Sequence, residues 1–419
     1  MSRDTNRGDF AILAAAHRAL SERDPDATIT AVSVELGNVG LDDPQYTGLT
    51  RGLGSAIVGT PVPPRGYFSG SAWGWAARLL WCECVLTASL VIGNRAFRLM
   101  PRDTRAFCDT IREADMVVAK GGSYLHALGG MREIVYLWRM LYPIRVGKRF
   151  GPPVVLLGVS VGEFRSRGAR RLARAVLRRG VMLYVREARS MEIVRRELRL
   201  PPQSVKLIPD LAFLIGPTET ETDRTAPAPR IGVTVRAHSH PQGDREAALR
   251  NYVQSLGMTL RTMLDGDENL TVVFIPQVTE DRVLAREIAA YVSRPARVEV
   301  LDNDVDLEAL LRIYGTLELL IAARLHSVIL AAAVGVPAVH VVYEPSKSYG
   351  TLDLLGMTEF GISYEDVSSD RLTALISEAR QRRGELHELI VDRVQALRAQ
   401  VKQVIAADWE KWDRQQDAA

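Results

Sequence analysis

The chain has 419 residues, and its 53 basic and 50 acidic side chains leave a formal net charge of +3, so no overall basic excess indicates nucleic-acid binding. Hydrophobic residues make up 47% and charged residues 25% of the chain, which is typical of globular proteins and excludes the disordered, collagen-like and coiled-coil classes. At about 150 residues per domain, the length predicts roughly two to three domains.

The cysteine content and the amino terminus both favour the cytoplasm. The cysteines are Cys82, Cys84 and Cys108, an odd number without zinc-binding spacing, which fits a reducing compartment. The residues before Asp9 are polar, so they contain no apolar core of a signal peptide. We therefore expect a cytoplasmic protein, with peripheral contact to the inner face of the membrane as an open alternative.

Residues 5–20, TNRGDFAILAAAHRAL, predict a polar turn that runs into a helix, with Asp9 as its N-cap. No strand pattern precedes this segment. Either the first strand of the sheet lies upstream of Met1, or the sheet lacks it.

The most apolar stretch of the sequence is residues 71–93. Arg78 and Glu83 interrupt it, so the uncharged run is too short to span a bilayer, and we interpret the stretch as a buried helix and strand. A membrane-touching surface is the alternative interpretation of its three tryptophans, Trp73, Trp75 and Trp81.

Short β-branched runs alternate with longer helical patterns, as in βαβ units that build a parallel sheet. Five runs precede residue 214: 27–34, 114–120, 152–160, 181–187 and 205–210. Five more follow residue 229: 230–236, 270–277, 296–302, 317–324 and 337–344. We therefore predict an α/β protein with two doubly wound, Rossmann-like domains, whose strand carboxyl ends face a cleft that holds the ligand.

A segment rich in proline and threonine separates the two sets of runs and predicts a linker at residues 217–229. The amino-terminal domain then comprises residues 1–216, and the carboxyl-terminal domain comprises residues 230–370. Helical periodicity continues to the end of the chain, so we expect residues 371–419 to form carboxyl-terminal helices.

The segment with the strongest functional pattern runs from residue 317 to residue 347. Arg324 and His326 follow a buried strand, and Ser327 is the predicted N-cap of the next helix. The amino terminus of a helix binds anions through its unpaired N–H groups, and a guanidinium adds a bidentate grip on phosphate or carboxylate. The alternative role for His326 is that of a capping histidine.

A second strand end follows closely in the sequence. Tyr343 and Lys347 come after the next buried run, so the lysine is expected at the same edge of the sheet as Arg324. The alternative interpretation of Lys347 is a solvated loop residue.

Gly121 and Gly122 follow another predicted strand directly, where the missing Cβ atoms let backbone N–H groups approach an oxygen-rich ligand. They match neither the G-x-G-x-x-G dinucleotide fingerprint nor the P-loop spacing, so a nicotinamide cofactor is unsupported. A plain tight turn is the alternative.

Two further arginines, Arg186 and Arg236, lie at predicted strand ends. The pair His238 and His240 lacks a nearby set of carboxylates, so we expect no metal site. The sequence contains no reactive-cysteine signature and no His-Glu-x-x-His motif.

Taken in order, these segments resemble the polysaccharide pyruvyl transferase family. The segments that carry the resemblance are NRGDFAIL, DMVVAKGGSYL, VVLLGVSVGEF, LYVREARS, KLIPDLAF, IGVTVR, ARLHS, GVPAVHVVYEPSK and LLGM. The resemblance implies a fold like that of the GT-B glycosyltransferases and phosphoenolpyruvate as the donor. It also implies a sugar hydroxyl of a glycan or lipid-linked acceptor, which becomes a pyruvyl ketal.

The resemblance also implies roles for particular residues. His326 is the general acid/base, since its unperturbed pKa lies near working pH. The residues expected to bind the donor are Arg324, Lys347, Arg186, Arg236 and Ser327. Most donor contacts then lie in the carboxyl-terminal domain, which leaves the acceptor to the amino-terminal side with Gly121, Gly122 and Asp9. Proton transfer needs neither a metal nor a cofactor.

The sequence departs from the family pattern at three places. The strand expected before NRGD is missing, Ala323 stands where glycine is usual, and residues 53–100 match no family segment. Two other functions remain open on the sequence alone. One is a glycosyltransferase of similar architecture that uses a nucleotide sugar, and the other is a non-catalytic α/β binding protein.

Overall fold

The computed structural model describes residues 7–30, 32–33, 58–59, 72–100, 102–216, 229–237, 245–301 and 305–416. The chain forms two compact units, and the boundary between them lies between Leu211 and Ala212. Helix α1 (Arg7–Arg23) is divided, because its residues up to Ala15 group with the second unit and the rest with the first. The linker predicted at residues 217–229 lies, except for Pro229, outside the described residues.

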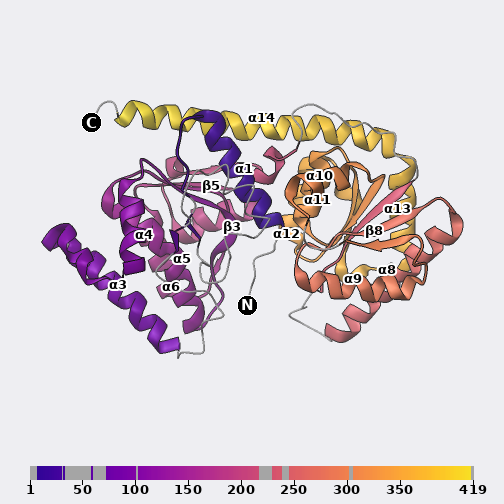
Figure 1. The fold of residues 1–419 in the computed structure, drawn as a ribbon, viewed down its shortest axis with the longest axis horizontal. Coiled ribbons are helices and arrows are strands. Elements are labelled where there is room, and N and C mark those ends of the chain that lie inside the picture. Colours follow the sequence, from indigo (N-terminus) through magenta and orange to yellow (C-terminus); the bar gives the residue numbers. More distant parts are fainter. Residues whose placement is uncertain are drawn as a thin grey trace. The chain divides into compact units, whose positions relative to one another are not determined.

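The first unit contains a four-stranded parallel sheet in the order β3-β4-β5-β6 (Figure 1). A separate two-stranded parallel ladder joins β1 (Val32–Ser33) to β2 (Val58–Gly59). The sheet and its main helices are β3 (Val117–Ala127), α5 (Met131–Phe150), β4 (Val154–Phe164), α6 (Arg167–Leu177), β5 (Val181–Val185), α7 (Ala188–Ile193), η3 (Val194–Leu198) and β6 (Val205–Leu207). Short helix η4 (Pro202–Ser204) precedes β6, and η5 (Leu211–Leu214) follows it at the boundary of the two units.

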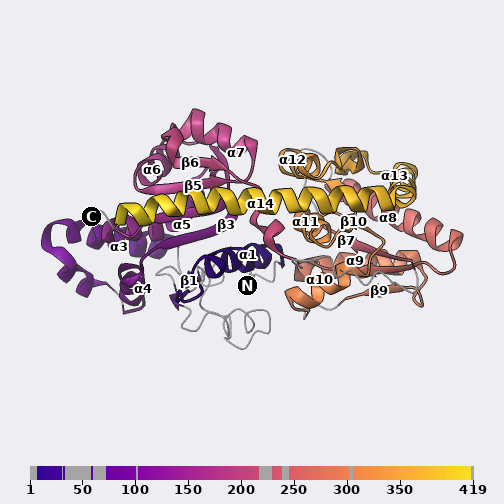
Figure 2. The same cartoon turned by 90° about the horizontal axis from the view of Figure 1, so that it is seen from above.

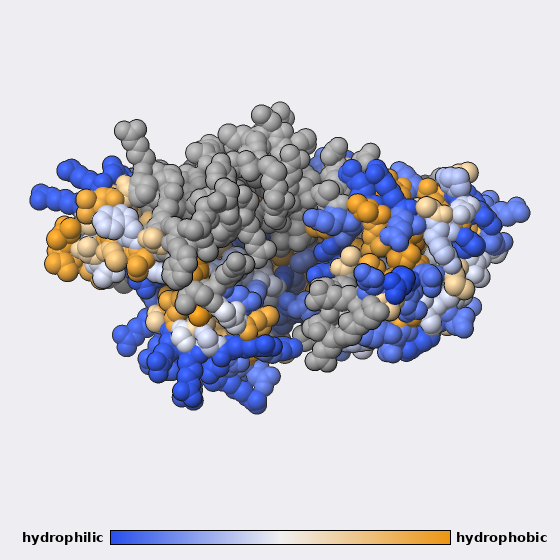
Figure 3. All heavy atoms as spheres, turned by 90° about the horizontal axis from the view of Figure 1, so that it is seen from below, coloured by the Kyte–Doolittle hydropathy of each residue, from blue (hydrophilic) through white to orange (hydrophobic). Residues whose placement is uncertain are grey.

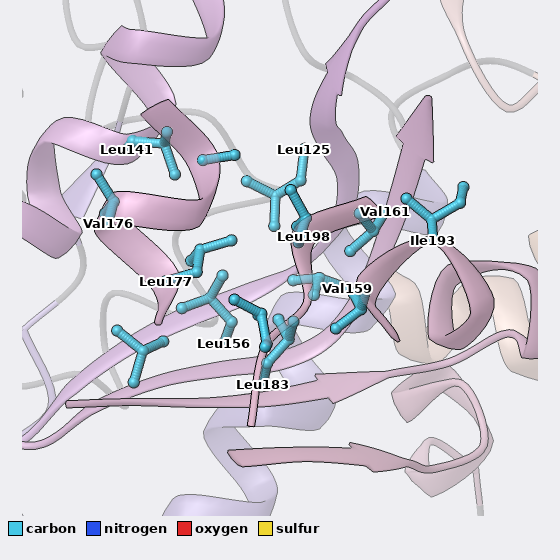
Figure 4. Close-up of a cluster of buried hydrophobic side chains, with 14 of the residues drawn as sticks. Leu125, Leu141, Leu156, Val159, Val161, Val176, Leu177, Leu183, Ile193 and Leu198 are labelled. Carbon is cyan, nitrogen blue, oxygen red and sulfur yellow. The ribbon is translucent and has the colours of Figure 1, made fainter. Parts of the chain in front are cut away.

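Successive strands of this sheet are neighbours, so right-handed crossovers place the connecting helices on one face. Figure 4 shows the resulting core, in which Leu156 and Leu183 of the strands lie beneath Leu141 of α5 and Leu177 of α6. Ser166 caps α6, because its hydroxyl accepts the N–H of Ala169 at 3.0 Å.

A second apolar cluster joins α5 to helices α3 (Ala72–Ile92) and α4 (Arg102–Glu113), with η2 (Gly93–Leu99) between them. The segment predicted as a helix and a strand is therefore a single helix, α3. Its buried residues Cys82, Val85 and Leu86 contact this cluster and hold the helix on the core. Nothing in its sequence starts a strand, since no turn residue interrupts the segment between Gly74 and Gly93.

The second unit contains a six-stranded parallel sheet in the order β9-β8-β7-β10-β11-β12, with helices on both faces (Figures 1 and 2). Its strands are β7 (Arg230–Thr234), β8 (Thr271–Phe274), β9 (Val298–Val300), β10 (Leu319–Ala322), β11 (Ala338–Val342) and β12 (Gly361–Ser363). The helices are α8 (Arg245–Gly266), α9 (Thr279–Val292), α10 (Leu307–Gly315), α11 (Leu325–Ala333), α12 (Pro345–Leu355), α13 (Ser369–Gln381) and α14 (Arg383–Gln416), with short turns η6 (Thr358–Phe360) and η7 (Tyr364–Asp366).

This strand order is that of a doubly wound sheet. From β7 the chain builds outward through β8 to β9, and it then returns to β10 beside β7 and continues to the opposite edge. The order reverses between β7 and β10, and ligands of such sheets bind at the carboxyl ends of the strands at that switch point. The α/β class with two parallel sheets, predicted from the sequence, is confirmed, and β12 is an additional strand that the sequence did not indicate.

Local sequence signals fix the helix ends near the switch point. Helix α11 ends before Gly335, whose φ of 75° is left-handed, and Pro337 follows two residues later. Asp306 caps α10 by accepting the N–H of Ala309 at 2.7 Å. The predicted helical tail consists of α13 and α14, and Arg398 of α14 donates to the carbonyls of Phe213 and Ala333.

No helix among the described parts of the chain combines the length and the apolar character needed to cross a membrane.

Candidate active site

The switch point of the second sheet brings two arginines together. Arg236 follows β7 and Arg324 follows β10, the two strands between which the order reverses. Burial lowers the pKa of the Arg236 guanidinium, and the nearby positive charge of Arg324 lowers it further. Two cations so close to each other favour an anionic ligand between them.

Asp281 holds the Arg324 side chain in place. Its two carboxylate oxygens accept from Nε at 3.1 Å and from Nη2 at 2.5 Å of Arg324, a bidentate pair. The carboxylate, only 2% exposed, also accepts the backbone N–H groups of Gln277 and Val278 at the start of α9. The pair uses Nε and Nη2, so Nη1 of Arg324 lies outside it.

His326 is the second residue of α11, and the beginning of α1 packs against it. A Cβ atom added to Gly8 would lie 2.5 Å from Nδ1 of His326 and 2.6 Å from Cγ. Only glycine fits this position without displacing the imidazole. The sequence motif NRGD therefore meets the ARLHS turn directly, a contact that the sequence did not indicate.

A buried network continues from this contact. The N–H of Arg7 donates to the carbonyl of Gln277 at 3.3 Å, and Nε2 of Gln277 donates to the hydroxyl of Tyr314 at 3.2 Å. Burial raises the pKa of Tyr314 to about 12, while Ser327 and Arg7 act in the opposite direction. These hydrogen bonds therefore hold in place the buried residues that pack beneath the first turn of α11.

The prediction that Ser327 caps α11 is wrong. Arg324 occupies the N-cap position, and Ser327 is the third helical residue, fully buried beside Tyr314. The helix begins earlier than expected because β10 already ends at Ala322, so the strand-to-helix turn needs only Ala323 and Arg324.

Lys347 lies in the first turn of α12, after β11, in agreement with the predicted strand end. Its ammonium forms an ion pair with Glu344 at 2.5 Å. Tyr343 lies beneath the Arg236 guanidinium, whose carbon is 3.9 Å from the ring centroid, a cation–π contact. Glu344 raises the pKa of Arg236 while Arg324 lowers it, so the charged groups of three strand ends influence one another.

A fully buried histidine connects the strand that leads to Arg324 with the helix that carries Lys347. Nδ1 of His340 lies 2.7 Å from the carbonyl of Ala322, and Nε2 lies 2.9 Å from the hydroxyl of Ser348 in α12. Burial lowers the pKa of His340 to about 4, so the ring is neutral at pH 7, with Nδ1 donating and Nε2 accepting. This histidine fixes the spacing of the two elements.

Arg186, in the first unit, is surrounded by protein groups. Its Nη1 donates to Asp210 at 2.5 Å and its Nε donates to Ser160 at 2.9 Å, while Nη2 reaches Ser123 at 3.4 Å. The side chains of Arg186 and Asp210 are 6% and 8% exposed. The predicted donor-binding arginine therefore holds β3, β4 and the end of β6 together.

Gly121 and Gly122 lie within β3, whereas the sequence placed them after a strand. The strand continues to Ala127 because Gly122 still pairs with Val159 of β4. A Cβ atom on Gly122 would lie 3.0 Å from Cδ1 of Tyr124, so this close approach, and not a left-handed φ, favours glycine there.

Asp9 is the third residue of α1, so it is not the N-cap that the sequence suggested, and its side chain lies outside the described residues. We expected Asp9 on the amino-terminal side, but it belongs to the second unit. The reason is that the first turn of α1 packs on His326 and Gln277.

No group of His, Cys, Asp or Glu side chains with metal-binding geometry occurs in the part of the chain that the structure describes. His238 and His240, the pair that we considered as metal ligands, lie outside the described residues.

Similarity to solved structures is consistent with this geometry. Anabaena Alr3699/HepE in complex with UDP-glucose matches over 96% of both chains with a TM-score of 0.53 and 12% identity. A glycosyltransferase from Rickettsia africae ESF-5 matches over 96% of this chain and 93% of its own, with a TM-score of 0.51 and 10% identity. At such low identity these matches show the fold, which is GT-B-like.

Sequence comparison adds the family. The amylovoran biosynthesis protein AmsJ of Erwinia amylovora is 25% identical over 313 residues, which cover 71% of this chain and 72% of that protein. Residues 6–345 match the family described as polysaccharide pyruvyl transferase. The match spans the NRGD segment, the ARLHS turn and β11, and it supports a glycan-modifying transferase. The chain belongs to the polysaccharide pyruvyl transferase family.

Proposed function

We propose that this protein transfers a pyruvyl group from phosphoenolpyruvate to a glycan or glycolipid and forms a cyclic pyruvyl ketal on two of its hydroxyls. The observation that carries the proposal is the anion site at the switch point of the second sheet. There Arg324, fixed by Asp281, lies close to Arg236 and one residue before the first turn of α11, which carries His326.

Phosphoenolpyruvate carries a carboxylate and a phosphate, so it needs cations at two places. Arg324 and Arg236 supply two planar guanidinium groups, and the positive end of the α11 helix dipole adds a further anion-binding element. Lys347 is paired with Glu344, which is 44% exposed, so exchange of that partner for a donor anion costs little. These four elements suit one small dianionic or trianionic donor.

The reaction balances with one proton donor and two hydroxyl groups. A proton adds to C3 of phosphoenolpyruvate, the first hydroxyl attacks C2, the C2–O bond to phosphate breaks, and the second hydroxyl closes the ketal at C2. The products are the ketal and inorganic phosphate, and the protons of the two hydroxyls account for the new methyl hydrogen and the phosphate proton. Arg324 and Arg236 stabilise the charge that develops on the leaving phosphate.

We assign the proton transfer to Nε2 of His326. Gly8 lies on the Cγ–Nδ1 side of the imidazole, so a donor would approach from the opposite edge, which carries Nε2. An imidazole can both give and take a proton, which suits it to general acid–base catalysis.

We assign acceptor binding to the amino-terminal unit, with Gly121 and Gly122 of β3 as the candidate contacts. Arg186 supports this role indirectly, because its guanidinium reaches Ser123, the residue that follows Gly122. Arg186 then acts as a positioning residue for the glycine segment.

The proposal is tested by ligand-induced thermal stabilisation of the purified full chain with phosphoenolpyruvate, UDP and inorganic phosphate. Phosphoenolpyruvate should raise the melting temperature of the wild type and of His326→Asn, and far less that of Arg324→Ala. Stabilisation by UDP without any by phosphoenolpyruvate would assign the chain to nucleotide-sugar chemistry and overturn the proposal.

Turnover is tested on the glycans of the source cell. Mass spectrometry of glycans and glycolipids with and without the gene should show the loss of a pyruvate-sized substituent, and the His326→Asn gene should fail to restore it. Restoration by a folded His326→Asn protein would remove His326 from the chemistry.

A further inference from the structure

Helix α3 presents an apolar face that is not part of the protein core. Its exposed residues recur every three or four positions and so share one helix face. They are Ala77, Leu80, Trp81, Cys84, Thr87 and Val91, of which only Thr87 carries a hydroxyl. Val91 is 87% and Trp81 is 50% exposed. The apolar surface continues through Leu90 and Ile92 to Leu99 of η2. Figure 3 shows the resulting hydrophobic patch over α3, with hydrophilic side chains beside it.

The opposite face of α3 accounts for the stability of the helix. Cys82, Val85, Leu86 and Ser89 are buried there, and Ser89 accepts from Nε of Arg149 in α5 at 2.8 Å. The exposed face is therefore not required to hold the helix in place. An exposed apolar stripe of this extent is typical of a surface that meets a partner or a membrane.

The charges around the stripe are positive. Glu83 is the only acidic residue between Ala72 and Met100, and it is buried, accepts from Nε1 of Trp138 and pairs with Arg145 at 2.7 Å. Arg95 and Arg98, in η2, are exposed at the end of the stripe. The surface thus combines apolar side chains with arginines and offers no exposed carboxylate among its described residues.

Hydrogen bonds at the carboxyl-terminal end of the stripe hold η2 in a fixed position. Arg105 of α4 donates to the carbonyls of Phe97 and Arg98, and Nε1 of Trp81 donates to the carbonyl of Leu99 at 3.1 Å. These bonds fix η2 against α3, so the apolar side chains and the two arginines form one surface.

We propose that α3 and η2 form an interfacial binding surface for a bilayer with anionic lipids. The apolar stripe enters the boundary between headgroups and acyl chains, Trp81 lies at that boundary, and Arg95 and Arg98 contact lipid phosphates. A second copy of the chain suits this surface less well, because it brings the same arginines and no exposed acid to pair with them. The proposal does not depend on the donor chemistry.

The test is co-sedimentation of the full chain with vesicles of phosphatidylcholine alone and of phosphatidylcholine mixed with phosphatidylglycerol. The wild type should bind the anionic vesicles more tightly. Val91→Gln and Leu90→Gln should each weaken binding to both kinds of vesicle by about tenfold, since each removes an apolar side chain from the bilayer. Arg95→Gln and Arg98→Gln should each weaken binding to anionic vesicles by about fivefold and leave binding to neutral ones unchanged.

Matched controls separate this surface from general surface hydrophobicity. Val283 of α9 is 72% exposed and Met258 of α8 is 49% exposed, so Val283→Gln and Met258→Gln make the same kind of change on helices of the second unit. Both controls should bind vesicles like the wild type. In addition, brominated lipids should quench tryptophan emission of the wild type more than that of Trp81→Phe.

Three results would overturn the proposal. One is equal loss of vesicle binding in the Val91 and Val283 variants. Another is wild-type binding that does not distinguish anionic from neutral vesicles. The third is the absence of vesicle binding together with a dimer, seen by light scattering, that Val91→Gln converts to a monomer. That result would assign the surface to a second copy of the chain. Phosphoenolpyruvate-induced stabilisation, measured in every variant, reports separately on the donor site.

Discussion

Gly8 and His326, which lie far apart in the sequence, are in direct contact, and a Cβ atom on Gly8 would lie 2.5 Å from the imidazole Nδ1. The contact places the first turn of α1 against the first turn of α11, within one unit. It gives a physical reason for a glycine in the NRGD segment, because any larger residue must displace the ring that we assign to proton transfer.

Gly8→Ala should therefore lower turnover by about 100-fold, since a displacement of the imidazole by roughly an ångström misaligns the proton with its acceptor. Donor affinity should change little. The control is Gly168→Ala, because Gly168 is likewise the second residue of its helix, and a Cβ there meets nothing within 4 Å. Kinetics and donor titration of both variants decide the matter, and wild-type turnover in Gly8→Ala would contradict the assigned role of the contact.

The bidentate pair of Arg324 and Asp281 should control donor affinity. Arg324→Ala removes a charge-assisted contact worth roughly 1.5 to 3 kcal/mol, so phosphoenolpyruvate should bind about 10- to 100-fold more weakly. Arg324→Lys should recover only part of the loss, because an ammonium cannot form the same fork with Asp281. Arg312, which pairs with Glu308 on the exposed face of α10, provides the control, and Arg312→Ala should leave donor titration unchanged. Equal affinities in all three variants would mean that the anion site lies elsewhere.

The buried pair of Arg186 and Asp210 should matter for stability. Asp210→Ala leaves a buried guanidinium without its carboxylate, at a cost of about 3 kcal/mol, and should lower the melting temperature by roughly 6 to 12 °C. Arg189 and Glu163 form an exposed pair nearby in the sequence, so Glu163→Ala should cost under about 1 kcal/mol. Calorimetry of both variants makes the comparison. Similar melting temperatures would show that the Arg186 pair contributes no more than a surface pair.

His340 should make the protein sensitive to mild acid. Burial lowers its pKa in the folded state to about 4 from its usual 6.5, so between these values the unfolded chain takes up a proton that the folded chain does not. The contribution of His340 to stability is therefore complete above pH 6.5 and is lost as the pH falls toward 4.

From pH 7 to pH 5 this loss should amount to about 2 kcal/mol. His340→Gln should flatten the dependence, even if it lowers the melting temperature at pH 7. Calorimetry at a series of pH values measures the slope, and a wild-type slope equal to that of the variant would exclude His340 as its source.

Much of the architecture follows from sequence patterns alone. Each of the ten β-branched runs overlaps a strand of the structure, because buried parallel strands need nearly continuous apolar residues whatever their neighbours are. Strand-end residues were equally predictable, since Arg236 and Arg324 end two of these runs and Lys347 comes three residues after another. The extent of β3 was not predictable from the sequence. Gly121 and Gly122 are typical of a turn, but pairing with β4 extends the strand beyond them.

The sequence by itself determined the α/β class, the residues at the strand ends and, through its motifs, the family. The tertiary structure alone decided which of those residues touch. Asp281 precedes Arg324 by a helix and two strands, and Gly8 is separated from His326 by most of the chain. Strand order brings the first pair together, and packing of α1 brings the second. The exposure of α3 was also decided by tertiary packing. Its sequence is apolar on both faces, and α5 covers only one of them.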